Sequence, residues 1–166
     1  ARRDERIRFL DFPKAPNRGE ANRHAAVLQA RGPIVCHLDD DDLWLPDHVE
    51  TMQLLLREAD LAITLPVLVQ ADGSILPFPV DLSRESHRLL FTHPWSGFAS
   101  SPTFVGYRTA IYRSLPRGWA PPPAGPASDK FVWAQFLARG GSRAVSSFYP
   151  TALGLPSPQR RDFSRK

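Results

Sequence analysis

The sequence predicts an α/β fold, with a mixed and mainly parallel sheet flanked by helices. Strand and helix patterns alternate over the first seventy residues, which is typical of sheets whose strands are joined by helices. The apolar run 33–38 lacks polar alternation, as expected of a strand buried on both faces. Ligands bind beyond the carboxyl ends of such strands. The four aspartates that follow this run therefore indicate where a site would lie.

The first elements can be placed from the periodicity of apolar residues and from the Pro, Asn and Gly residues between them. Residues 6–12 alternate between apolar and polar side chains and predict a strand, followed by a loop containing Pro, Asn and Gly. Apolar side chains at helical spacing predict a helix over 20–31, which Gly32 closes. Pro46, a residue favoured at the first helical position, opens a second helix over 46–59.

The later elements are less regular. The pattern predicts strands over 61–69, 75–80, 103–108 and 142–149, and helices over 109–115 and 129–139. Residues 92–103 form an irregular connection, and five prolines within 116–126 predict a loop. We expect one domain over 1–155 and a polar, basic tail over 156–166.

The composition fits one core. A chain of 166 residues, 42% of them apolar, can bury a single core but not comfortably two. No apolar run approaches the ~20 residues that span a bilayer. Cys36 is the single cysteine, so no internal disulfide can form. We expect a cytoplasmic protein, and leave association with a membrane surface open.

Charge is distributed unevenly along the chain. Residues 1–33 carry eight Lys/Arg against four acids, 34–106 carry three against eleven, and 107–166 carry ten against two. Codon usage would explain an arginine excess in the flanks, but not the acidic centre. This distribution argues against a plain nucleic-acid-binding face. It is typical of a site where carboxylates hold a cation and arginines meet phosphate.

The run Asp39 to Asp42 is the most informative stretch. Four adjacent carboxylates repel one another, which is costly unless a cation or solvent relieves the charge. Carboxylates two residues apart at the end of a strand can converge on Mg²⁺ or Mn²⁺. Such a cation could bridge the oxygens of a diphosphate. Two other interpretations remain open: a solvated acidic loop, and a helix-capping role for Asp42 near Pro46.

Three blocks of the sequence resemble glycosyltransferase family 2, whose members have the GT-A fold. The first is Asn17-Arg18-Gly19 with the helix that ends in Ala30-Arg31-Gly32, the second runs from Leu38 to Pro46, and the third is Ser128-Asp129-Lys130-Phe131-Val132-Trp133. The resemblance covers residues 6 to about 150. The second block is similar to the family's Asp-x-Asp motif with its downstream proline.

The resemblance implies roles for particular residues. Arg23 would face the donor nucleotide, and Asp39 and Asp40 would lie against its ribose and diphosphate. Asp41, together with Asp39, would hold Mg²⁺ or Mn²⁺. Asp129 would be the general base on the acceptor hydroxyl, although the residues alone equally allow a helix-capping role at this position.

The implied activity is metal-assisted transfer of a sugar, with inversion, from a nucleotide-sugar donor to a hydroxyl of a glycan, lipid or other acceptor. We expect no nucleic-acid partner. The family's opening strand has no counterpart here, so we expect the chain to be truncated at its N-terminus, with the first strands missing. A late histidine found in many GT-A enzymes is also absent, since residues 151–154 are Thr-Ala-Leu-Gly.

Two rival functions and several lesser residues remain. A GT-A-like nucleotidyltransferase would use carboxylates and a cation in the same way. A non-catalytic carbohydrate- or cation-binding module could descend from a glycosyltransferase. Trp95 and Trp119 lie in loops where they could stack on an acceptor sugar or simply cover the sheet. We expect Trp44 and Trp133 in the core, and His37 as a minor ligand candidate.

Overall fold

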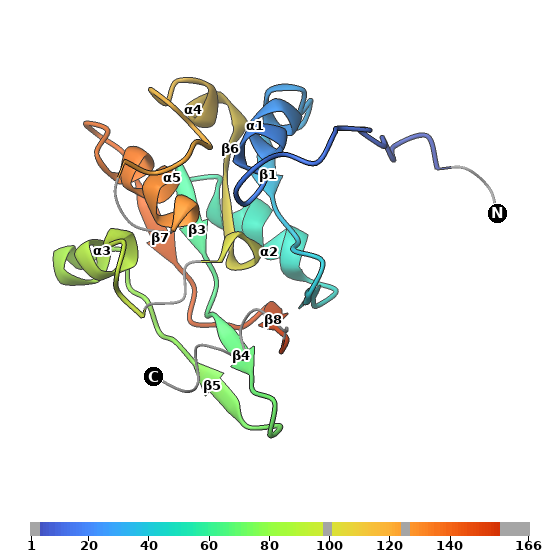
Figure 1. Cartoon of the computed structure of the whole chain (residues 1–166). Coiled ribbons are helices and arrows are strands. Elements are labelled where there is room, and N and C mark those ends of the chain that lie inside the picture. The colour runs from blue at the N-terminus through green and yellow to red at the C-terminus, as the bar shows by residue number, and fades with distance from the viewer. Residues whose placement is uncertain (1–3, 98–100, 124–126, 157–166) are drawn as a thin grey trace.

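The computed structural model describes residues 4–97, 101–123 and 127–156. Within these ranges the strands form two mixed four-stranded sheets. The larger has the order β1-β6-β3-β7, with strands Ile34–Cys36, Val105–Arg108, Leu61–Ile63 and Ala144–Ser146. The smaller has the order β2-β8-β4-β5, with strands Asp42–Trp44, Ala152–Gly154, Val67–Val69 and Ile75–Pro77. Strands β4, β5 and β8 lie together at one end of the molecule (Figure 1). The predicted α/β class is confirmed. The expectation of mainly parallel pairing is wrong, because four of the strand pairs in the described residues are antiparallel and two are parallel.

Strand direction in the larger sheet is mostly uniform. Strands β1 and β3 both pair antiparallel with β6, and β3 pairs parallel with β7. Therefore β1, β3 and β7 run the same way, and β6 is inserted against them. In the smaller sheet, β4 and β8 are parallel, whereas β2–β8 and β4–β5 are antiparallel.

Helices cover both faces of the larger sheet. They are α1 (Glu20–Leu28), α2 (His48–Leu55), α3 (Glu85–Thr92), α4 (Thr109–Arg113) and α5 (Ser128–Leu137), with a 3₁₀ turn, η1, over Pro102–Phe104. On one face Ala62 of β3 packs with Met52 of α2. Its neighbours Leu61 and Ile63 point to the other face, in a cluster with Trp133 of α5. This alternation is the strand period of two.

The strand predicted over 6–12 is wrong. This segment pairs with no strand in the described residues, and the N-terminal chain leads away from the rest of the molecule (Figure 1). Ile7 and Phe9 are 76% and 87% exposed. An alternating pattern predicts a half-buried strand only where a neighbouring strand can pair with its backbone.

The apolar run 61–69 forms two strands rather than one. Strand β3 belongs to the larger sheet and β4 to the smaller, and the chain changes sheets across residues 64–66. Pro66 has no backbone N–H to give to a ladder, which favours a break there.

Strands β2 and β8 were not predicted. The basic tail lies almost wholly outside the described residues.

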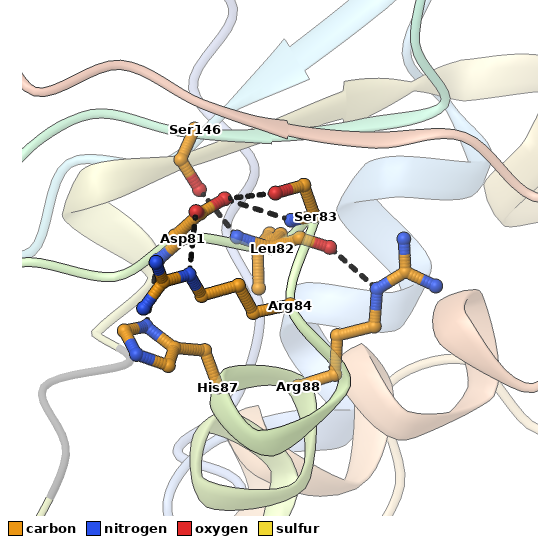
Figure 2. Close-up of polar contacts among 7 residues, drawn as sticks. All are labelled: Asp81, Leu82, Ser83, Arg84, His87, Arg88 and Ser146. Carbon is orange, nitrogen blue, oxygen red and sulfur yellow. Dashed lines mark hydrogen bonds and ion pairs between the residues drawn. The ribbon is translucent and has the colours of Figure 1, made fainter.

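Helix α3, also not predicted, is anchored by the polar turn before it (Figure 2). Asp81 Oδ1 accepts hydrogen bonds from the Ser83 hydroxyl at 2.6 Å and the Ser83 backbone N–H at 3.0 Å, and these hold the pKa of Asp81 below its ordinary value. The Leu82 N–H donates to Ser146 Oγ of β7 at 2.9 Å. Arg88 Nε of α3 donates to the Leu82 carbonyl. These bonds fasten the start of α3 to the larger sheet.

None of the helices in the described ranges is both long and apolar enough to cross a membrane.

Candidate functional site

The four aspartates lie where the chain passes from the larger sheet to the smaller. Asp39 follows β1, Asp40 and Asp41 form a turn, and Asp42 begins β2. The Asp42 backbone N–H donates to the Asp39 carbonyl at 3.2 Å, which closes the turn. The helix-capping interpretation of Asp42 is wrong, because the N-cap position of α2 belongs to Asp47. We refer to residues 39–42 as the aspartate turn.

The carboxylate of Asp42 is engaged by the protein itself. Thr103 Oγ1 donates to Asp42 Oδ2 at 2.6 Å, and the Leu155 N–H donates to Asp42 Oδ1 at 3.3 Å. The same Thr103 hydroxyl accepts a hydrogen bond from the Asp39 N–H at 3.2 Å. Thr103 is fully buried. Its hydroxyl therefore ties together the two ends of the aspartate turn.

The ionised form of the Asp39 carboxylate is disfavoured by its surroundings. Burial raises its pKa, and the neighbouring charges of Asp42 and Asp41 act in the same direction. Arg23 and a hydrogen bond from Ser101 Oγ, at 3.2 Å to Oδ2, oppose this rise without cancelling it. A cation placed at this carboxylate would favour its ionised form.

Arg23 reaches the aspartate turn from α1. The Trp119 ring, on which its guanidinium rests, meets the ring of His37 with centroids 5.5 Å apart, so the side chain of Arg23 lies close to the end of β1. Its guanidinium carbon lies 4.4 Å from the centroid of the Trp119 ring, within the range of a cation–π interaction. The indole therefore supports the guanidinium beside the carboxylates.

Trp119 is a buried support and not an exposed plate. It is 2% exposed. Its backbone N–H donates to the Tyr112 hydroxyl at 2.9 Å, and its indole N–H donates to the Tyr107 hydroxyl at 3.4 Å. The prediction that Trp119 could stack on a sugar is wrong. Trp95, in contrast, is 70% exposed.

His37 packs in the same aromatic group, which consists of Trp119, Tyr107 and Tyr112. Its Nε2 lies 2.7 Å from the Tyr107 hydroxyl, and its ring meets Trp119 edge-on with centroids 5.5 Å apart. Burial, with the nearby charge of Arg23, lowers the pKa of His37 to about 3. The ring is therefore neutral at pH 7, and its Nε2 is engaged by Tyr107.

Asp129 lies in the first turn of α5. The alternative that it caps this helix is wrong, because the N-cap position belongs to Ala127. Asp129 and Trp133 are four residues apart and share one face of the helix. Trp133 is fully buried, with its ring edge-on to Trp119 at 5.5 Å. The face of α5 that bears Asp129 thus adjoins the aromatic group that supports Arg23.

Comparison with known families identifies the family of this chain. Residues 1–115 match the sequence profile of glycosyl transferase family 2, which is well over half of the chain. This chain belongs to that family. Arg23, Asp39, Asp40 and Asp41 all lie within the matched segment, and Asp129 lies beyond it.

Solved structures agree with the family's α/β fold. The crystal structure of S. aureus TarS 1-349 resembles this family 2 chain with a TM-score of 0.56 and 19% sequence identity. The likeness covers 87% of this chain and 41% of that one, so the chain spans less than half of that structure's length. No curated protein matches the sequence.

The carboxylates of the aspartate turn suit a hard cation whose remaining coordination positions are filled by oxygens of the substrate. Across residues 4–97, 101–123 and 127–156, no three His, Cys, Asp or Glu side chains are grouped to hold a metal ion. Mg²⁺ commonly binds one or two carboxylates and fills its remaining positions with substrate phosphates and water. Asp39 and Asp41, whose charges repel, are the two carboxylates that could fill this role.

Sequence reasoning missed the residues that hold the site together. Ser101 lies in a stretch predicted as an irregular connection, and Thr103 was predicted only as the start of a strand. Trp119 was left open between stacking on a sugar and covering the sheet. Local sequence carries no sign of their hydrogen bonds, which join residues about sixty positions apart for Thr103 and Asp42. Two hydroxyl residues followed by a strand were the only available signal.

Proposed function

We propose that this chain contributes the donor site of an inverting glycosyltransferase that moves a sugar from a nucleotide-sugar donor to an acceptor hydroxyl. The position of the Arg23 guanidinium on Trp119, whose ring meets His37 just before the aspartate turn, carries this proposal. A diphosphate suits such a site, because a cation on the carboxylates and a guanidinium can neutralise its oxygens from different sides.

The donor-facing roles follow from the aspartate turn. Asp39 and Asp41 would hold Mg²⁺ or Mn²⁺, and this cation would neutralise charge on the departing diphosphate. Asp39 and Asp40 would contact the ribose and the diphosphate. Arg23 would pair with a phosphate. Because its guanidinium already rests on Trp119, it would lose little conformational freedom when the donor binds.

Asp129 would act on the acceptor. A general base that removes the proton from the attacking hydroxyl, on the side opposite the leaving diphosphate, gives inversion at the sugar carbon. Asp129 is one of two acids after residue 106, and it lies half-buried in the first turn of α5. Acceptors in this proposal are glycans, lipids or other molecules with a free hydroxyl.

The proposal can be tested by incubating the full-length protein and Mn²⁺ with UDP-, GDP- and dTDP-sugars and a panel of glycan and lipid acceptors, and measuring the release of nucleoside diphosphate that depends on the acceptor. Asp129→Asn should lower turnover by roughly 10²–10⁴-fold, since the amide keeps the shape but cannot take the proton. Donor binding should be nearly unchanged. Asp47→Asn, at the start of α2, is the matched control and should keep its activity.

Each alternative result has a distinct meaning. Retained turnover in Asp129→Asn would assign the base to another carboxylate. Donor binding without turnover by the wild-type protein would support a non-catalytic binding module. Absence of binding to every nucleotide sugar would refute the proposal.

A further inference from the structure

We propose that Thr103 is the positioning residue that sets the geometry of the aspartate turn for cation binding, an inference that rests on the proposed function. Its hydroxyl joins the first and last aspartates, accepting from the Asp39 N–H at 3.2 Å and donating to Asp42 Oδ2 at 2.6 Å. Its carbonyl accepts from the indole N–H of Trp44 at 3.2 Å. One buried residue thus makes three contacts with the segment 39–44.

These contacts give one of the four aspartates a structural role. Asp42 is the anchor, since both of its oxygens accept hydrogen bonds from the protein. Asp40 and Asp41 lie between the two tied ends. Fixing both ends of a short turn limits the directions in which the intervening side chains can leave it.

Thr103, which holds the two ends of the aspartate turn, is attached to the paired strands of the larger sheet. Thr103 lies in η1, directly before β6, and β6 is paired on both sides by β1 and β3. A short hydrogen bond from a hydroxyl to a carboxylate is also stronger than a neutral one. Thr103 therefore opposes the mutual repulsion that would otherwise spread the aspartates into solvent.

The test compares Thr103→Val and Thr103→Ala, which lack the hydroxyl, with Thr103→Ser, which keeps it, in the full-length protein. Calorimetric titration with Mn²⁺ should show 10–100-fold weaker binding for Val and Ala, the usual effect of losing an outer-shell partner, and near wild-type affinity for Ser. Amide exchange at Asp39 and Leu155 should accelerate only in the variants without the hydroxyl.

Thr64→Val is the matched control. Thr64 is equally buried, and its hydroxyl has no hydrogen-bond partner in the part of the chain that the structure describes. This variant should bind Mn²⁺ like the wild type.

Wild-type Mn²⁺ affinity in either folded variant that lacks the hydroxyl would overturn the positioning role and leave the proposed function standing. A wild-type protein that binds a nucleotide sugar but no Mn²⁺ would overturn the positioning role and the metal assignment together. Failure to bind both would refute the proposed function itself.

Discussion

His48 should make the stability of the fold depend on pH. This first residue of α2 is fully buried, its ring is stacked on Trp44 at 4.6 Å, and its Nδ1 lies 2.7 Å from Thr151 Oγ1. Its Nε2 has no hydrogen-bond partner in the described residues. Burial lowers the pKa of His48 from 6.5 to about 4, with Asp47 and the Thr151 bond opposing the shift.

The sign follows from the lowered pKa in the folded state. Above pH 6.5 the ring is neutral in both states, and its contribution to stability is fully present. As the pH falls from 6.5 towards 4, the unfolded chain takes up the proton and the folded chain does not, so the free energy of unfolding falls. At 1.36 kcal/mol per pKa unit the full loss is about 3 kcal/mol. For a domain of this size that is roughly 6–12 °C in melting temperature.

Thermal unfolding followed by circular dichroism from pH 7.5 to 4.5 measures this loss. His48→Asn is the matched variant, because its amide oxygen can take the place of Nδ1 opposite Thr151 but does not titrate. The wild-type melting temperature should fall more steeply with pH than that of the variant. Parallel curves for the two proteins would refute the reasoning.

Two further predictions concern packing and anchoring. Gly106→Ala should cost about 1–3 kcal/mol in urea unfolding through overpacking, since an added Cβ would lie 2.9 Å from Met52 Sδ. Gly97→Ala should be nearly neutral, since an added Cβ there meets no atom of the described residues within 4 Å; equal stabilities of the two variants would contradict this. Lys130→Met should cost about 1–3 kcal/mol and accelerate limited proteolysis around Ser96, whose carbonyl accepts from Lys130 Nζ at 2.7 Å; an unchanged cleavage pattern would show that this bond does not hold the loop.

The sequence predicted most of the periodic elements and few of the short ones. Helices α1, α2 and α5 have apolar faces, and Gly32 and Pro46 lie near the ends of the first two, so local pattern was enough to find them. The predicted ranges 20–31 and 46–59 were too long, since α1 ends at Leu28 and α2 spans His48–Leu55. Strands β2 and β8 have three residues each, too few for an alternating pattern to register. The segment 6–12 has the pattern of a strand but no neighbour, and pairing depends on chain that is distant in sequence.

The candidate site was found in outline but not in its internal arrangement. Four consecutive aspartates after an apolar run are visible in any reading of the sequence. The expectation that this run is a strand buried on both faces is wrong, because β1 is an edge strand of partly exposed residues in the described part of the chain. That Asp42 is an anchor depends on the hydroxyl of Thr103, which arrives only when the chain folds. The position of Trp119 was left open for the same reason: its loop composition allows the surface, whereas the hydroxyls of Tyr107 and Tyr112 accept its N–H groups and hold it inside.

The passage of the chain between the two sheets bears on how this protein could be re-engineered. Within the described residues the chain crosses from the larger sheet to the smaller at 37–41, 64–66 and 147–151, and the first of these crossings contains the aspartate turn. The smaller sheet is therefore not a module that could be exchanged through one splice. A chimera that replaced it would need matched junctions at these three crossings and also at the two returns, from β2 to β3 and from β5 to β6. The first crossing passes through the carboxylates themselves. The hairpin of β4 and β5, which projects beyond those junctions, is where grafted sequence would disturb the aspartates least.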